Sequence, residues 1–304
     1  MKIAPLRSLS LAVTALAVLA VSAGAQQRDF SQVQITTTKI TDNFYALEGQ
    51  GGRIGVLSGP DGVLMVDGQF APLTEKIVAA IKQISPQPIR FLVNTHVHGD
   101  HTGGNENFAK MGVVIYSRPQ LRDRLAHPRP NAQGNTPRPA PEMALPKVTY
   151  NERTTWHMNG EEVELIAIPR AHTDGDTMVR FPANDVIMTG DFYRSVAYPN
   201  IDRNNGGSLD GMLRGLGVVI GLAGPSTKIL PGHGPIVDRN AVVAHRDMML
   251  GVKDAVAKLI REGKSEQEVI AANPAGPFES KVAEPGTSRD RFVAQVYAEL
   301  KASL

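Results

Sequence analysis

The chain has 304 residues, of which 42% are hydrophobic and 20% are charged, and this composition is typical of a globular protein rather than a disordered or fibrous one. Its formal net charge of +2 gives no sign of the strongly basic surface that nucleic-acid binding requires. The absence of cysteine excludes disulfides and thiolate metal ligands. A chain of this length fits one large αβ domain or two fused halves.

The first 25 residues have the features of an export signal. Lys2 and Arg7 precede an apolar run over residues 11–21, and the small residues 23–25 form a cleavage pattern. The run is shorter than the roughly 20 residues of a membrane span. We therefore expect cleavage after Ala25, a periplasmic or secreted protein and no stable membrane insertion. Losing Lys2 and Arg7 takes the formal charge from +2 to zero, which disfavours a nuclease.

The first half of the mature chain has the pattern of strands followed by a helix and a buried strand. Residues 43–69 alternate apolar and polar side chains around the turn GPDG at 59–62, which predicts a β-hairpin. Residues 73–84 place apolar side chains on one helical face, and residues 89–95 form an apolar, β-branched run that predicts a buried strand.

The second half repeats this organisation. It has predicted strands at 162–169, 185–191 and 227–232 and predicted helices at 208–224 and 241–263. Two β-rich halves, each completed by helices, predict an αββα four-layer sandwich in which residues 26–304 form a single domain. Residues 127–146 contain six prolines and are expected to form a loop without regular structure between the halves, either as plain surface or as a cover for the site.

The segment NTHVHGDHTGG, residues 94–104, contains three of the eight histidines of the chain together with an aspartate. It follows a predicted strand and so lies at a carboxyl end, where αβ folds place their sites. Alternate residues of an extended segment point the same way, so His96 and His98 should share one direction and Asp100 and His101 a neighbouring one. This geometry suits two adjacent metal ions better than one.

Three further candidate ligands also follow predicted strands and stand beside glycine or a tight turn: His172 in PRAHTDGDT, Asp191 in MTGDFY and His233 in PGHGP. Zinc accepts imidazole nitrogen and carboxylate oxygen, and a catalytic zinc site normally uses three protein ligands and leaves a position open for water. The candidates therefore suffice for two Zn²⁺ ions per chain. Iron or manganese also accepts these ligand types.

In these motifs and in their order, the sequence resembles the metallo-β-lactamase superfamily from about residue 40 to 245. The resemblance implies the αββα fold and a binuclear metal centre. It implies that the first metal is held by His96, His98 and His172 and the second by Asp100, His101 and His233. It further implies that Asp191 bridges the two ions.

Two bound metals indicate hydrolysis, because a bound zinc lowers the pKa of its water toward about 7 and a second ion polarises the substrate. We therefore expect an exported zinc-dependent metallo-hydrolase that uses a metal-bridging hydroxide to cleave an ester, lactone, amide or lactam bond in a small molecule. Asp100 is the candidate catalytic residue, which orients the hydroxide or transfers a proton. The bridging Asp191 is more like glyoxalase II and lactonases than like β-lactamases. The alternatives are a β-lactamase proper and a non-catalytic metal-binding module.

The segment 191–208 directly follows the bridging aspartate, so its side chains are expected to surround the substrate pocket. Tyr193, Arg194 and Tyr198 are the candidate substrate contacts, since an arginine binds a carboxylate through two parallel hydrogen bonds. Surface or packing roles are expected for the remaining histidines, which are His127, His157 and His245.

Overall fold

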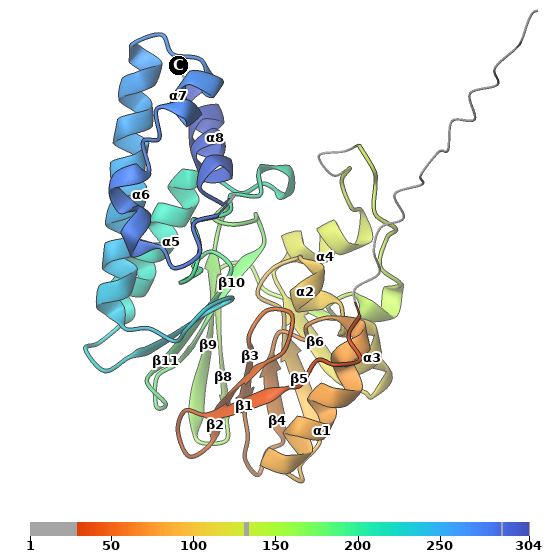
Figure 1. Cartoon of the computed structure of the whole chain (residues 1–304). Helices are drawn as coiled ribbons and strands as arrows, with labels where there is room; N and C mark the ends of the chain where they lie inside the picture. Colours follow the sequence, from red (N-terminus) through yellow and green to blue (C-terminus); the bar gives the residue numbers. More distant parts are fainter. Residues whose placement is uncertain (1–28, 131–133, 287, 304) are drawn as a thin grey trace, which may run out of the picture.

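The computed structural model describes residues 29–130, 134–286 and 288–303, and the expected signal peptide lies outside these ranges. Two β-sheets pack face to face, and helices cover the outer face of each sheet (Figure 1). This arrangement confirms the predicted αββα sandwich.

The first sheet has seven strands that pair in sequence order. Its first four strands are antiparallel, and from β4 onward neighbouring strands run parallel, so β4 and β5 end at the same edge of the sheet. The strands are β1 (Thr36–Lys39), β2 (Phe44–Glu48), β3 (Ile54–Leu57), β4 (Val63–Val66), β5 (Ile89–Val93), β6 (Val114–Ser117) and β7 (Val148–Thr149).

The second sheet has five strands in the order β12-β11-β10-β9-β8. Since β10 is antiparallel to both of its neighbours and β12 is parallel to β11, the strands β9, β11 and β12 all end at one edge. The strands are β8 (Arg153–Met158), β9 (Glu161–Ile168), β10 (Asp176–Phe181), β11 (Val186–Gly190) and β12 (Lys228–Pro231). Three of them, β9, β11 and β12, are the strands predicted from the sequence.

The helices divide between the two outer faces. The predicted helices at 73–84, 208–224 and 241–263 correspond to α1, α5 and α6. The α-helices are α1 (Thr74–Ile84), α2 (Gly99–Thr102), α3 (Asn105–Lys110), α4 (Pro119–Ala126), α5 (Leu209–Leu222), α6 (Arg239–Arg261), α7 (Glu266–Ala271) and α8 (Ser288–Lys301). Short 3-10 turns occur at Ala71–Leu73, Glu142–Ala144, Arg203–Asn205 and Gly276–Lys281. The 3-10 turn at Glu142–Ala144 lies within the proline-rich loop, residues 127–146, for which no regular structure was expected. The other described residues of this loop form neither helix nor strand.

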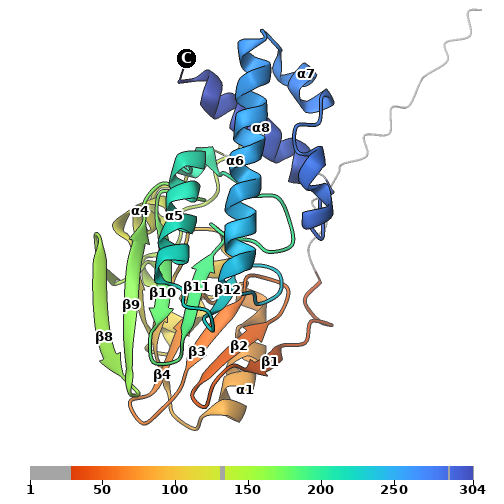
Figure 2. The ribbon, with the colours of Figure 1, turned by 90° about the vertical axis from the view of Figure 1, so that its left-hand side faces the viewer.

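Side-chain alternation along the strands builds the layers. On β4, Leu64 and Val66 face the second sheet, whereas Val63 and Met65 face α1 on the outside. The outer face of the second sheet packs against α5 and α6, and α8 packs on α6; Figure 2 shows α5 and α6 lying across these strands. No helix in the described ranges is both long enough and apolar enough to cross a membrane.

Candidate metal centre

The predicted ligands meet at one edge of the sandwich because the strands that precede them all end there. The segment that begins at His96 follows β5, and His172 follows β9. Asp191 directly follows β11, and His233 follows β12. The structure therefore brings together candidate ligands that are up to 137 positions apart in the chain, from His96 to His233.

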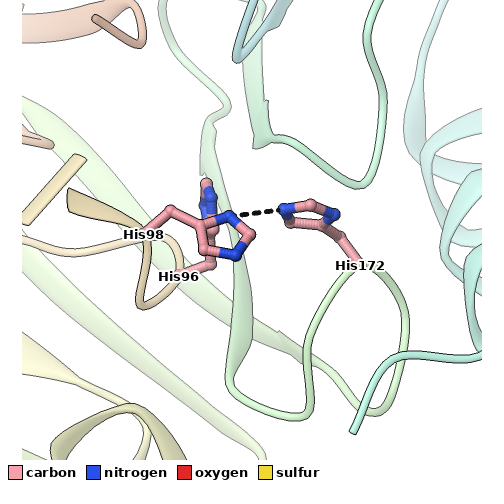
Figure 3. A group of neighbouring side chains, drawn as sticks. All are labelled: His96, His98 and His172. Carbon is pink, nitrogen blue, oxygen red and sulfur yellow. Dashed lines mark hydrogen bonds between the residues drawn. The ribbon is translucent and has the colours of Figure 1, made fainter. Parts of the chain in front are cut away.

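One group of potential ligands consists of His96, His98 and His172. One nitrogen from each ring lies within 4.8 Å of the others. Figure 3 shows the rings of His98 and His172 facing each other beside His96, and His172 Nε2 lies 2.9 Å from His98 Nδ1. This is the group that the resemblance assigns to the first metal.

A second group consists of Asp100, His101 and His233, whose potential ligand atoms also lie within 4.8 Å of one another. The Asp100 Oδ2 atom lies 3.2 Å from His233 Nε2 and 3.8 Å from His101 Nε2. Asp191 lies between the two groups. Its Oδ1 atom is 3.3 Å from His101 Nε2 and 3.4 Å from His233 Nε2, and it forms a further potential ligand group with His101 and His96.

Three buried atoms at this centre have no hydrogen-bond partner among the described residues: His96 Nε2, His101 Nε2 and Asp191 Oδ1. A buried polar atom without a partner costs about 1–3 kcal/mol, so three that converge indicate a missing partner. Two are imidazole nitrogens and one is a carboxylate oxygen, which are zinc ligands. A Cβ added to Gly232 would collide with Asp191 Oδ1, so the glycine keeps the space beside this oxygen open. The residues fit a metal centre.

The electrostatics of the centre also favour cation binding. Burial lowers the pKa of His96 well below its usual value and that of His172 to about 4, so both rings are neutral, as metal binding requires. Burial opposes the ionisation of Asp191, but the positive charge of the neighbouring His101 imidazole lowers its pKa well below the usual range. Burial also opposes protonation of His233, yet the neighbouring Asp100 and Asp191 carboxylates raise its pKa. The carboxylates therefore attract positive charge to this position.

A second set of residues, which the sequence did not reveal as functional, orients the ligand rings. Asp67 follows β4 and accepts a hydrogen bond from His101 Nδ1 at 2.7 Å. The Thr95 hydroxyl donates to Asp67 Oδ2 at 2.7 Å, so it accepts from His96 Nδ1 at 3.1 Å. These bonds place the protons on the Nδ1 atoms and leave both Nε2 atoms free to bind metal. The one sequence feature that could have indicated a role for Asp67 is its position directly after the strand β4.

The loop after β11 orients the other two rings of the first group. His172 Nδ1 donates to the Asn200 carbonyl oxygen at 2.6 Å, and His98 Nε2 lies 2.7 Å from Asp202 Oδ2. Consequently His172 presents Nε2 and His98 presents Nδ1 to the centre. Nothing in the local sequence marks Asn200 or Asp202 as partners of these histidines.

The structure does not bring all three expected substrate contacts to the site. Tyr198 is fully buried in the helical core, where its hydroxyl donates to the Ala275 carbonyl oxygen at 3.1 Å, and this position corrects the expected substrate contact to a packing role. Tyr193 is 2% exposed and packs edge-on against His245, with ring centroids 4.9 Å apart. Arg194 is half-buried, and its Nε has no partner in the described ranges, so it stays a candidate.

The other histidines have the surface and packing positions that were expected. His127 and His157 are exposed, with side chains 78% and 75% accessible. His245 lies on α6 and packs against Tyr193.

The profile of the metallo-beta-lactamase superfamily matches residues 49–241, which is more than half of the chain. Two solved structures show the same fold. A metallo-beta-lactamase from Pontibacter korlensis has a TM-score of 0.59 and 20% identity over 71% of this chain and 99% of its own. The inverting sec-alkylsulfatase Pisa1 from Pseudomonas sp. has a TM-score of 0.66 and 16% identity over 89% of this chain and 50% of its own.

Two curated relatives match shorter parts. A linear primary-alkylsulfatase from Pseudomonas sp. (strain ATCC 19151) is 34% identical over 77 residues, which are 23% of this chain and 15% of that protein. The alpha subunit of a 2,4-dinitroanisole O-demethylase from Nocardioides sp. (strain JS1661) is 27% identical over 152 residues, which are 47% of this chain and 44% of that protein. The chain thus spans less than half the length of these relatives.

Proposed function

Because this chain belongs to the metallo-β-lactamase superfamily, we propose that it is an exported, binuclear zinc hydrolase of a small-molecule substrate. The observation that carries the proposal is the convergence of His96 Nε2, His101 Nε2 and Asp191 Oδ1, three buried ligand atoms without partners among the described residues. Structural zinc sites use four protein ligands, whereas each potential ligand group here has three, which is typical of a catalytic site with a position open for water.

The residues divide the work of the proposed reaction. The first ion would be held by His96, His98 and His172, the second by Asp100, His101 and His233, and both by Asp191. When bound, such ions lower the pKa of water toward neutrality and polarise the bond to be cleaved.

Asp100 is the candidate for proton transfer. Its side chain is 28% accessible, so it reaches the open side of the centre, and its Oδ2 atom lies 3.2 Å from His233 Nε2. Burial opposes its ionisation, but the hydrogen bond from His233 lowers the pKa of Asp100 to about 2. As an ionised carboxylate it orients a water molecule and accepts a proton in passing.

The proposed bond is an ester, lactone, amide or lactam, with β-lactamase activity as the second candidate. The alkylsulfatase relatives add sulfate esters to the substrates to be tested, because a segment of 77 residues is 34% identical to such a protein. All of these bonds are opened by attack of water on an electrophilic centre next to a leaving group, and the centre described above serves each of them.

A substrate panel on metal-analysed protein tests the proposal. Purified residues 26–304 are assayed with a lactone, an aryl ester, a β-lactam, an alkyl sulfate and a phosphodiester, each before and after chelation. We expect turnover of at least one substrate, loss of that turnover on chelation and near-complete loss in His96→Ala. Two bound ions with no turnover of any substrate would support the non-catalytic module instead.

A further inference from the structure

The proline-rich loop contributes to a hollow of about 260 Å³ beside the metal centre. One wall comes from the ligand loop, through Val97, His98 and Gly99. The other wall includes Arg129 and Arg138 from the proline-rich loop. His98 therefore belongs both to the candidate metal centre and to this second space, which we call the arginine groove.

Each of the two arginines stands between two prolines. The sequence reads Pro128-Arg129-Pro130 and, nine positions later, Pro137-Arg138-Pro139. A residue that precedes proline is restricted to extended conformations, and proline fixes its own φ. The repeated motif therefore limits the backbone freedom of both arginines, so that less entropy is lost when they bind a ligand.

The groove has uncompensated positive charge. Its lining contains no carboxylate side chain within the part of the chain that the structure describes. A third lining arginine, Arg124, is neutralised by an ion pair with Asp174. By contrast, within the described ranges Arg129 donates only to the Asn204 carbonyl oxygen at 3.3 Å, and neither Arg129 nor Arg138 forms an ion pair there. Two guanidinium groups thus remain available for an anion.

We propose that the arginine groove binds an anionic oxygen group of the substrate, such as a carboxylate, while the bond to be cleaved lies at the metal centre. Arginine matches such groups through paired hydrogen bonds. The volume is below the roughly 300–1,000 Å³ of sites that enclose a whole drug-sized ligand, so the groove accommodates a substituent. Val97, Leu125 and Ala140 supply apolar contacts for the adjoining carbon atoms. This inference rests on the proposed hydrolase function.

Two aryl esters that differ in one charge test the groove. The neutral substrate is 4-nitrophenyl butyrate, and the anionic one is mono-4-nitrophenyl glutarate. In the metal-loaded protein, Arg129→Gln combined with Arg138→Gln should raise the KM of the glutarate ester about tenfold and leave its kcat within about twofold. The kinetics of the butyrate should not change. The matched control is Arg214→Gln, which removes an exposed arginine on α5 that pairs with Asp210.

An equal change in KM for both esters, or no change for either, would show that the arginine groove does not bind the anionic group. If the wild-type protein cleaves neither ester, the proposed ester hydrolysis fails, and the groove is then tested by calorimetric titration of the same metal-loaded variants with glutarate. Weaker glutarate binding in the double variant than in wild type and Arg214→Gln supports the groove. Equal binding in all three overturns it.

An independent observation concerns α8, which lies outside the family match at 49–241. Gln295 on this helix accepts a hydrogen bond from the Ile201 amide and donates one to Asn200 Oδ1, both at 3.0 Å. These two loop residues stand beside the contacts that orient the first metal group, since the Asn200 carbonyl oxygen binds His172 and Asp202 binds His98. Helix α8 thus fixes the position of residues 200–202, which in turn orient His98 and His172.

We infer that Gln295 is a positioning residue for the first metal. Gln295→Ala should weaken zinc binding by the first group, His96, His98 and His172, about three- to tenfold, below the roughly 10–100-fold typical of direct partners of a ligand. Glu299→Gln is the matched control, because Glu299 on the same helix accepts from the Leu209 amide at 2.7 Å and forms no hydrogen bond with Asn200 or Asp202 among the described residues. Competition with a chelating dye measures the affinity, and thermal unfolding of the metal-free variants measures stability. Equal zinc affinity in Gln295→Ala and Glu299→Gln would contradict the inference.

Discussion

Asp202 Oδ2 lies 2.7 Å from His98 Nε2, on the far side of the ring from the Nδ1 atom that faces His172. Asn205 Nδ2 donates to the same carboxylate oxygen at 2.7 Å, which fixes the orientation of Asp202. The contact holds the His98 proton on Nε2 and leaves Nδ1 as the metal-facing nitrogen. A residue far from the ligand motif in sequence therefore decides which nitrogen of His98 is available.

We expect Asp202→Asn to weaken binding of the first metal about tenfold, because the neutral amide gives the imidazole less support than the carboxylate. Zinc titration against a chelating dye measures this effect. Asp210→Asn serves as the control, since Asp210 is exposed on α5 and its side chain pairs with Arg214. Unchanged zinc affinity in Asp202→Asn would show that the contact with Asp202 does not affect metal binding by His98.

Asp191 distinguishes a bridged centre from two independent metals. Its Oδ1 atom lies between His101 and His233 and also groups with His96, so Asp191→Ser removes an anionic ligand from both ions. The second metal should bind more weakly, and hydrolysis of the best substrate should fall at least about tenfold. Metal analysis and steady-state kinetics measure the two effects. His96→Ala is the control, with near-complete loss of activity under either arrangement.

Two bound metals and unchanged turnover in Asp191→Ser would show that Asp191 does not bridge the two ions. The comparison with glyoxalase II and lactonases, which depends on this aspartate, would then fail as well.

Much of the metal centre could be predicted from the sequence because the ligands are tied to strand ends. The apolar runs of β5, β9, β11 and β12 mark where the chain reaches the edge of a sheet, and a candidate ligand stands within four residues after each of them. Asp67 follows β4 in the same way but stands outside any recognisable motif, so it was missed.

Contacts that depend on packing between distant elements could not be predicted. Tyr198 is close to Asp191 in sequence, but the loop turns its ring into the helical core, where it stacks on Phe292 of α8. The link from Gln295 to Asn200 joins segments 95 positions apart and has no periodic pattern. Sequence spacing indicates which element carries a residue, whereas the packing of the elements decides which side the residue faces.

His245 should make stability depend on pH. Burial lowers the pKa of this histidine to about 4, so its ring stays neutral in the folded protein while the unfolded chain protonates it near pH 6.5. The neutral ring therefore stabilises the folded state fully above about pH 6.5. Between pH 6.5 and pH 5 the free energy of unfolding falls by up to about 2 kcal/mol, because the unfolded chain gains the proton. In His245→Gln, unfolding by denaturant at pH 7 and pH 5 should show a smaller loss than in wild type. The same loss in both proteins would contradict the burial of a neutral ring.

Export predicts a shortened N-terminus. Lys2 and Arg7 flank the apolar run, and cleavage after Ala25 should remove both. Intact-mass measurement of protein recovered from a periplasmic or culture-medium fraction gives the first residue directly. A mass that includes residues 1–25 in that fraction would contradict the signal peptide.

The measurement that most directly tests the binuclear centre is the metal content of the mature protein together with an equilibrium zinc titration. Two ligand groups that meet at Asp191 predict two zinc ions per chain, both lost on exhaustive chelation and both restored on titration. His233→Ala should reduce the content to about one ion, because it removes a ligand from the second group alone. One tightly bound ion in the wild-type protein, with no second binding event at excess zinc, would contradict the account.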